Sequence, residues 1–415
     1  MDTRKRIASL IAGVAIVAAA CGTTATPSPS VEPSAEPSAA PSVEPAGLSG
    51  KITVWHAYGS SGGSAEFRAF SRILEDMKIA YPDLEIEAIE VPFSDIYRNF
   101  EAESGAGGGP DMFIAPNDSL GSEARGGYLF DLTGKIDDVL GNSIDVAVAG
   151  SKVADAVSMV PESLKAVAMY YDAAVVTDPP TTTEELMAYV EGGGKVGLIT
   201  GAYFGWGFYS AFGGAIFDDA GKCAATANSG IADAIAYVKA LRDAGALVDP
   251  DYGKVNNAFL SGDIDIMLNG NWTLGDYKAA RPALAVAPVP TGPGGPARTM
   301  AGVDGWYINA ASANAELAIA VAKELVNFAN QRTYVDIAGH VPANKDVTVL
   351  DPLVKGFTDA ILQGDARPQS EEFNNYWGPF GDAWNKAIPA DGSAGGDPAT
   401  LVGEACTLMD TANKK

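Results

Sequence analysis

The chain has 415 residues, of which 47% are hydrophobic and 19% are charged. This length suits about two domains, and this composition excludes global disorder. Asp and Glu number 52 against 28 for Lys and Arg, which gives a formal net charge of −24. The balance argues against a nucleic-acid-binding protein and against a polybasic membrane-binding surface. Two histidines and three cysteines are too few for a His-rich metal centre, a four-cysteine zinc module or a disulfide scaffold.

The first 20 residues have the pattern of a secretion signal. Basic residues at positions 4–6 precede an uncharged apolar run over 7–20, which is shorter than the roughly 20 residues of a membrane-spanning helix. The run ends in small residues followed by Cys21, which resembles a bacterial lipobox. The alternative is an ordinary secretion signal with an incidental cysteine. We expect a signal peptide over 1–20 and a lipidated Cys21 as the first mature residue.

The next segment has the composition of a linker. Residues 22–47 are rich in Pro, Ser and Ala and contain no aromatic residue, no Lys and no Arg. Such a segment cannot bury enough apolar surface to fold, and its prolines favour an extended chain. We expect 21–47 to tether a lipid anchor to a globular part.

The globular part begins near Lys51 and alternates strands with helices. Strands are predicted over 51–55, 84–91 and 111–115 because apolar and β-branched residues alternate there. Helices are predicted over 63–81 and over 95–104, the second with Ser94 as its N-cap. Alternation in units of about 30 residues favours an α/β fold with parallel, doubly wound sheets.

The later chain continues in this style. Further strands are predicted over 195–200, 264–268 and 284–289. Further helices are predicted over 230–244, 313–330, 353–362, 376–388 and 398–413. No repeat of solenoid period is present.

Catalytic motifs are weak. The sequence has no nucleophile elbow with a plausible histidine partner and no phosphate-binding P-loop. The glycine cluster at 105–109 precedes a strand, which is the wrong order for a phosphate cradle. A glycosidase pair of carboxylates stays open among 52 acidic residues, although any chosen pair is more often solvated surface.

Aromatic residues give a clearer signal. Six aromatic side chains crowd into 203–212, Trp272 follows a predicted buried strand, and Trp377 lies beside two asparagines. Flat apolar rings with amide and acid neighbours suit sugars, which present an apolar C–H face and a rim of hydroxyl groups. Each tryptophan taken singly can instead be a core residue.

At these motifs the sequence resembles maltose/maltodextrin-binding proteins, the extracellular solute-binding subunits of sugar ABC transporters. The resemblance covers 48–413. It is carried, in the family's order, by ITVWHAYG (52–59), GPDMFIAPND (109–118), PESLKAVAMYYD (161–172), AYFGWGFYSAFGG (202–214), IDIMLNGNW (264–272), GVDGWYI (302–308), AGHVPANK (338–345) and NNYWGPFG (374–381).

The resemblance implies an α/β, two-lobed fold of the periplasmic-binding-protein type (type II), with two doubly wound lobes joined by a hinge. Lobe I is expected to comprise 48–163 and 302–349, and lobe II to comprise 164–301 and 350–415. The ligand is expected in the cleft between the lobes. The implied cleft residues are His56, Tyr58, Asp118, Tyr203, Trp206, Trp272, Asp304 and Trp377.

Departures from the family pattern bear on the sugar. The family's best-known members have charged residues where this chain has Gly201 and Ser119, and a glutamate where it has Lys165. Maltose or maltodextrin is the expected ligand, with other oligosaccharides as alternatives.

The implied function is capture of an oligosaccharide and its delivery to the permease subunits of an ABC importer, without catalysis, cofactor or metal. The protein is expected to be a monomer that is held by its lipid anchor on the outer face of the cytoplasmic membrane. A lipid-anchored glycoside hydrolase is the alternative function.

The remaining cysteines, Cys223 and Cys406, are expected to form a disulfide. With Cys21 lipidated they are an even pair in an oxidising compartment, and both are assigned to lobe II. Two separate buried thiols are the alternative.

Overall fold

The computed structural model describes residues 47–59 and 62–415. The predicted signal peptide over 1–20, the lipidation site Cys21 and the linker up to residue 46 lie outside the described residues. Residues 47–415 form one unit, and only this unit is described below.

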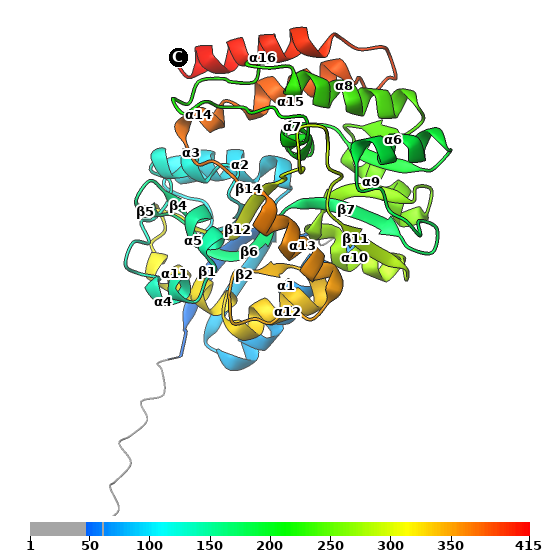
Figure 1. Ribbon diagram of the computed structural model, residues 1–415. Coiled ribbons are helices and arrows are strands. Elements are labelled where there is room, and N and C mark those ends of the chain that lie inside the picture. Colours follow the sequence, from blue (N-terminus) through cyan, green and yellow to red (C-terminus); the bar gives the residue numbers. More distant parts are fainter. Residues whose placement is uncertain (1–46, 60–61) are drawn as a thin grey trace, which may run out of the picture. The chain divides into compact units, whose positions relative to one another are not determined.

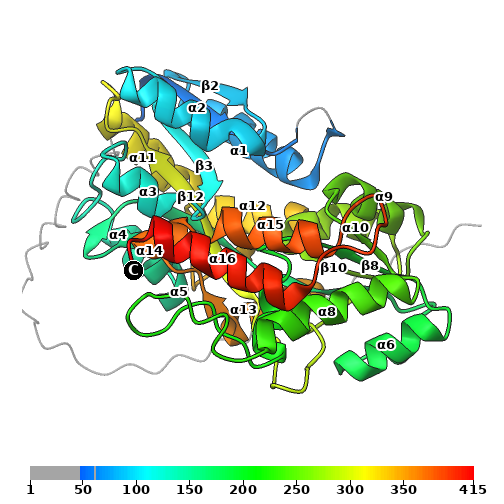
Figure 2. The same cartoon turned by 90° about the horizontal axis from the view of Figure 1, so that it is seen from above.

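Two large sheets organise this unit (Figures 1 and 2). The first sheet has the strand order β13 (Val341–Pro342), β6 (Val160–Lys165), β12 (Met300–Ile308), β3 (Met112–Pro116), β1 (Gly50–His56) and β2 (Leu84–Glu90), with β14 (Asp365–Ala366) beside β12. The second has the order β11 (Leu284–Ala287), β7 (Val167–Asp172), β10 (Ile266–Gly270), β8 (Val196–Ile199) and β9 (Leu247–Asp249). A separate ribbon pairs β4 (Lys152–Val153) with β5 (Ala156–Val157).

Both large sheets are mixed, so the prediction of parallel sheets is wrong in this respect. Strand β1 runs parallel to β2 and β3, but β12 runs antiparallel to β3 and β6. In the second sheet β8 runs parallel to β9 and β10, whereas β7 runs antiparallel to β10 and β11. The local alternation of strand and helix in the sequence indicates only the parallel strand pairs. The antiparallel pairs join strands from distant parts of the chain, so this pattern does not show them.

Helices cover the sheets. Those that precede β6 or lie between β12 and β13 in the sequence are α1 (Ala65–Ala80), α2 (Phe93–Gly105), α3 (Leu120–Arg125), α4 (Asp137–Gly141), α5 (Asp145–Gly150), α11 (Ala315–Leu325) and α12 (Phe328–Ala338). The others are α6 (Thr183–Glu191), α7 (Trp206–Ala211), α8 (Gly230–Asp243), α9 (Tyr252–Ser261), the 3₁₀ turn Asn271–Thr273, α10 (Leu274–Ala280), α13 (Pro352–Gln363), α14 (Glu371–Asn374), α15 (Trp377–Ala387) and α16 (Pro398–Ala412). Helices α8, α15 and α16 lie side by side (Figure 2).

Helix α1 shows why the sequence folds locally as it does. Phe70, Ile73 and Met77 are spaced by three and four residues, and all three are buried against the first sheet. The helix begins after Ser64, whose hydroxyl accepts a hydrogen bond from the Phe67 amide at 3.0 Å.

Two helix predictions were wrong. The predicted helix over 313–330 is two helices, because α11 ends at Leu325 and the Asn327 side chain caps α12 by accepting from the Asn330 amide at 2.9 Å. Ser94 was predicted as an N-cap but lies in the first turn of α2, which begins at Phe93 directly after Pro92.

The chain passes directly from the first sheet to the second at Ala166. Strand β6 ends at Lys165, and β7 begins at Val167. Buried Asn271 holds this passage, since its side chain accepts from the Ala166 amide at 3.1 Å and donates to the Leu164 carbonyl at 2.9 Å. The residue boundaries of the two lobes stay a prediction.

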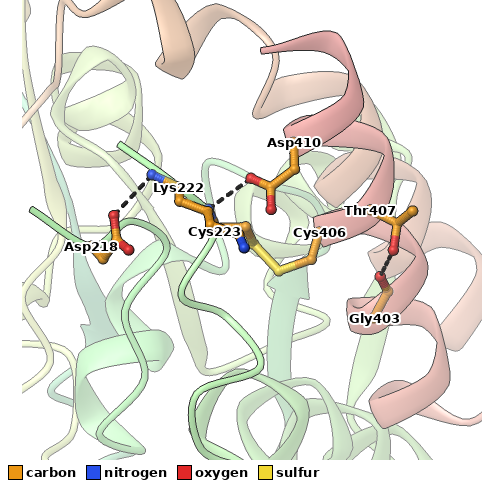
Figure 3. Close-up of a disulfide and its surroundings, with 7 residues drawn as sticks. All are labelled: Asp218, Lys222, Cys223, Gly403, Cys406, Thr407 and Asp410. Atoms are coloured by element: carbon orange, nitrogen blue, oxygen red, sulfur yellow. Dashed lines mark hydrogen bonds between the residues drawn. A yellow bond between two sulfur atoms is a disulfide. The ribbon is translucent and has the colours of Figure 1, made fainter. Parts of the chain in front are cut away.

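Cys223 and Cys406 are joined in a disulfide, with their Cα atoms 5.4 Å apart (Figure 3). The bond ties the turn that contains Asp218 and Lys222 to helix α16. The Cys223 amide also donates to Asp410 of α16 at 2.8 Å.

Candidate ligand-binding site

A cleft of about 550 Å³ is lined by segments of both sheets. The strands of the first sheet contribute residues after β1, in and after β3, at the end of β6 and in the middle of β12. The second sheet contributes residues after β8, β9 and β10. Its volume falls in the range of about 300–1,000 Å³ that small-molecule sites occupy. Most of the lining is apolar, with a few charged groups set into it.

The first sheet supplies a cluster of charged side chains that we call the charge network: Glu66, Glu162, Lys165, Asp304 and His340. Lys165 Nζ lies 2.6 Å from Glu66 Oε1, 3.2 Å from Asp304 Oδ2 and 3.1 Å from His340 Nε2. His340 Nε2 lies 2.8 Å from Glu66 Oε1, and its Nδ1 lies 3.2 Å from Glu162 Oε1. Glu66, Lys165 and Asp304 reach the cleft.

The network shifts the pKa of its members in opposite directions. Burial raises the pKa of Asp304 to about 6, despite the opposing charge of Lys165. Burial also opposes ionisation of Glu66, but Lys165 and His340 outweigh it and lower the pKa of Glu66 to about 2. The pKa of Lys165 is raised, because three carboxylates outweigh its burial. The cleft floor therefore carries ionised groups at neutral pH.

Asp304 lies where β12 is irregular. The pairing of β12 with β6 shifts register between Asp304 and Gly305, and a Cβ on Gly305 would lie 2.5 Å from Met159. A bulge re-aims the neighbouring side chain. Asp304 Oδ2 faces Lys165, whereas Asp304 Oδ1 is buried and has no hydrogen-bond partner among the described residues. A buried acceptor of this kind, on a side chain that lines the cleft, can take a proton donor from a ligand.

A second ion pair joins Asp118, just after β3, to Arg367, just after β14. Strand β14 pairs with β12, and the Arg367 amide donates to the Ala301 carbonyl at 3.0 Å. A Cβ on Gly302 would lie 2.9 Å from the guanidinium, so the absence of a side chain there makes room for Arg367. Arg367 Nη1 also donates to Asn117 Oδ1 at 3.0 Å.

Aromatic rings surround this arginine. The guanidinium carbon of Arg367 lies 5.3 Å from the Tyr203 ring centroid and 5.9 Å from that of Trp377. Within the described chain, neither Tyr203 Oη nor Trp377 Nε1 has a hydrogen-bond partner, although both atoms are buried.

The second sheet supplies the cleft with rings, which we call the aromatic wall: Tyr203, Phe204, Tyr252 and Trp272. The Trp272 ring lies 5.9 Å from Tyr203 and 6.2 Å from Phe204, and its Nε1 donates to Tyr252 Oη at 3.0 Å. A Cβ on Gly270 would lie 1.9 Å from the Trp272 ring, so glycine lets the ring fold back over the strand end. Because the Trp272 N–H already has a hydrogen-bond partner within the wall, the faces of its ring are left for apolar contact.

The structure brings five of the eight predicted cleft residues to the cleft lining: Tyr58, Asp118, Tyr203, Trp272 and Asp304. The other three lie outside the lining and form the following contacts.

His56 is buried beside Tyr58 and Phe70, and burial lowers its pKa. Trp206 is 8% exposed, and its Nε1 donates to Asp365 at 3.2 Å. Trp377 reaches the site only through its contact with Arg367.

The lining residues that sequence reasoning did not predict as ligand-site candidates include Glu66, Phe93, Lys165, Tyr252 and Arg367. Glu66 and Phe93 lie in the first turns of α1 and α2, directly after strand-to-helix connections, and this position was the available signal. Arg367 follows a two-residue strand that periodicity cannot detect.

The described residues contain no group of three or more His, Cys, Asp or Glu side chains that could hold a metal ion. In the same part of the chain, no helix has the length and apolar character needed to cross a membrane.

The comparison with known families decides the assignment. The family described as "Bacterial extracellular solute-binding protein" matches residues 73–358. The chain belongs to this family. Its members' role as binding proteins fits a cleft lined by rings and paired charges.

Individual relatives carry sugar-binding names. The chain is 28% identical to the maltotriose-binding protein of Pyrococcus abyssi over 356 residues, which is 80% of this chain and 76% of the relative. It is 25% identical to a maltooligosaccharide ABC transporter solute-binding lipoprotein of Streptococcus pneumoniae, over 73% of this chain and 76% of the relative.

Among solved structures, the Thermus thermophilus maltotriose-binding protein bound with maltotriose is 28% identical. It has a TM-score of 0.78 and covers 87% of this chain and 100% of its own. A maltose/maltodextrin-binding domain from Bdellovibrio bacteriovorus, at 20% identity and a TM-score of 0.79, covers 88% of this chain and 100% of its own and shares the fold. The two-lobed α/β fold class is therefore confirmed.

Proposed function

We propose that this protein captures a maltose- or maltodextrin-type oligosaccharide in the cleft and delivers it to the permease subunits of an ABC importer. The observation that carries the proposal is the pairing of an aromatic wall with a wall of charged side chains across one cleft. The names of the relatives, which include maltotriose- and maltooligosaccharide-binding proteins, support the choice of sugar.

The two walls suit the two chemical faces of a sugar ring. A pyranose presents C–H groups above and below the ring, and these can lie against Trp272 and Tyr252. Its hydroxyl groups project from the rim, where ionised carboxylates accept and cationic groups donate hydrogen bonds. Asp304 Oδ1 and Tyr203 Oη, which are buried and have no partner within the described chain, can be satisfied by such hydroxyls.

We propose that the sugar is bound without being cleaved. The cleft does contain two carboxyl groups whose pKa values diverge, Glu66 at about 2 and Asp304 at about 6, and such divergence also occurs in glycosidases. Both carboxylates are held by the same Lys165 ammonium. The relatives reported above are named as binding proteins and not as enzymes.

The test is calorimetric titration with maltotriose, a panel of β-linked oligosaccharides for comparison, and chromatography of the sugar after prolonged incubation. Binding with full recovery of intact maltotriose supports the proposal. Release of shorter sugars establishes the hydrolase alternative. Absence of binding to every α-linked oligosaccharide contradicts the choice of sugar.

We also propose that Cys21 is the lipidated first residue of the mature protein and that 21–47 tethers the cleft-bearing part to the membrane. One acyl chain gives only reversible membrane binding, so stable anchoring requires more than one. Mass spectrometry of the native N-terminus tests this, and a mature start after Cys21 without lipid contradicts it.

A further inference from the structure

His340 lies behind the cleft and does not line it. It follows α12, is 0% exposed, and stacks on Tyr334 with ring centroids 4.9 Å apart and an interplanar angle of 6°. Its two ring nitrogens face two different carboxylates, Glu66 at 2.8 Å and Glu162 at 3.2 Å. Of these two glutamates, Glu66 is the one that reaches the cleft.

The contacts with the two carboxylates favour the protonated ring. An ionised carboxylate only accepts hydrogen bonds, so hydrogen bonds to both Glu162 and Glu66 require a proton on Nδ1 and on Nε2. The Lys165 ammonium, 3.1 Å from Nε2, opposes this form, because it donates to that nitrogen when the ring is neutral. Burial and the neighbouring Lys165 disfavour the imidazolium, but Glu162 and Glu66 outweigh them and raise the pKa of His340 to about 9. At neutral pH the network then has Lys165 and His340 as cations facing three carboxyl groups.

We infer that protonated His340 is a positioning residue. It holds Glu66, and through Glu66 also Lys165 and Asp304, in the arrangement that binds the hydroxyl groups of an oligosaccharide. Protonation of His340 and binding of the ligand are therefore coupled. This inference rests on the proposed function. Glu66 Oε1 is the shared atom, since it contacts both His340 Nε2 and Lys165 Nζ. Lys165 in turn contacts Asp304 at 3.2 Å.

The other groups that face His340 do not titrate in the same range. The pKa of Lys165 is raised by its carboxylate partners, and those of Tyr334 and Tyr58, whose hydroxyls lie 3.4 Å apart, are raised well above the ordinary value by burial. Glu66 and Asp304 have pKa values of about 2 and about 6. In the network, a change between pH 8 and pH 10 therefore reports His340.

The direction in which pH changes the affinity follows from the hydrogen bonds of His340. When pH rises through about 9, the ring loses one N–H and the network loses one positive charge. Either Glu66 or Glu162 then loses its hydrogen bond from His340, while Glu66 keeps its contact with Lys165. We expect maltotriose to bind about tenfold more weakly to the deprotonated protein, which corresponds to about 1.4 kcal/mol. By reciprocity, saturating maltotriose should raise the pKa of His340 by about one, because coupling between two binding equilibria is mutual.

The chain suits a direct measurement because its sequence contains only two histidines, His56 and His340. Imidazole NMR signals of the wild-type protein are followed from pH 5 to pH 10.5, with and without maltotriose, and the spectrum of His56→Gln assigns them. The expected result is one histidine that titrates near pH 9 in the free protein and about one pH unit higher with sugar. Calorimetry over pH 7 to 10 should show a roughly fivefold loss of affinity, because at pH 10 only part of the tenfold limit is reached when sugar raises the pKa by about one.

His340→Gln supplies the second test. It should bind about tenfold more weakly than wild type at pH 7 and with nearly constant affinity up to pH 10. The control is Glu316→Gln. Glu316 lies on α11, and its exposed side chain pairs with Lys135, so this variant should keep the wild-type pH profile.

The outcomes are distinguishable. If maltotriose does not bind at pH 7, the proposed function fails and this inference fails with it. If maltotriose binds, but affinity is constant to pH 10 and sugar leaves the His340 titration unchanged, the inference alone is wrong. Because the NMR titration uses the wild-type protein, misfolding of His340→Gln would not prevent this decision.

Discussion

The two walls of the cleft are built in different ways. The charged wall consists of Glu66, Asp118, Lys165, Asp304 and Arg367. It is centred on the strands of one sheet, with Lys165 on β6 and Asp304 on β12, two strands that pair directly. The rings of the aromatic wall lie outside the strands: Tyr203 precedes α7, Tyr252 is the first residue of α9, and Trp272 lies in a 3₁₀ turn after β10. A buried charge needs its partners fixed at hydrogen-bond distance, whereas a ring needs only a surface to lie on. The charged wall is therefore the rigid, orienting side, and the aromatic wall supplies apolar contact.

Buried polar atoms without partners sharpen this contrast. Asp304 Oδ1 on the charged wall and Tyr203 Oη on the aromatic wall are both buried and lack a hydrogen bond within the described residues. Leaving either atom without a hydrogen-bond partner costs free energy. A bound hydroxyl group at either atom removes that cost, so the ligand is expected to bridge the two walls.

The largest expected effect on affinity comes from the aromatic wall. Trp272→Ala should weaken maltotriose binding by roughly 30- to 1,000-fold, because truncation of a buried aromatic anchor typically costs about 2–4 kcal/mol. Stability should change little, since Trp272 is only half-buried in the free protein. Calorimetry and the melting temperature of the unliganded variant check both parts.

Trp384 is the matched control for a core tryptophan. It is 1% exposed, and its Nε1 donates to Tyr209 Oη at 2.7 Å. Trp384→Ala should cost about 3–5 kcal/mol of fold stability. If Trp272→Ala behaves like Trp384→Ala and its folded fraction binds normally, the aromatic wall is core and not a ligand surface.

The charged wall should show a smaller effect on affinity. Asp118→Asn should weaken binding by about 10- to 100-fold, because it removes one charge-assisted acceptor worth about 1.5–3 kcal/mol. It should also lower stability, since buried Arg367 loses its carboxylate partner. Asp76→Asn, which removes an exposed partner of Arg72 on α1, is the control and should leave affinity unchanged.

Phe93 tests whether the charged wall also contributes apolar contact. It lines the cleft, is 50% exposed and is the first residue of α2. Phe328 is 53% exposed and is the first residue of α12, but it does not line the cleft. Phe93→Ala should weaken binding about fivefold, or about 1 kcal/mol, whereas Phe328→Ala should have no effect. Equal affinities for the two variants would remove Phe93 from the site.

How much of this could be predicted from the sequence differs between the walls. The crowded rings over 203–212 and Trp272 were visible as sugar-type aromatics, and two of them line the aromatic wall with Trp272. The charged wall was largely invisible, because among 52 acidic residues only the fold shows that Glu66 and Asp304 meet at Lys165.

The same limit applies to the fold. Periodicity predicts α1 and β1 because each buries one face within its own segment. It did not detect the break between α11 and α12, which depends on the Asn327 cap, or the antiparallel placement of β12 between β3 and β6. Those features arise from contacts between distant segments or from a single side chain.

The disulfide should affect affinity least, although its cysteines belong to the same hydrophobic cluster as Tyr203, Phe204 and Trp272. It joins Cys223 to Cys406, 183 residues apart, and neither cysteine lines the cleft. Replacing both cysteines by serine should cost about 2–5 kcal/mol of stability, because the bond restricts the unfolded chain. Affinity should change by less than about twofold, since α16 still packs against α8 and α15 without the bond. Melting temperature and calorimetry on the double variant separate the two effects. A large loss of affinity together with unchanged stability would mean that the bond positions the aromatic wall. The contrast between a charged wall that orients the ligand and an aromatic wall that supplies apolar contact would then have to be revised.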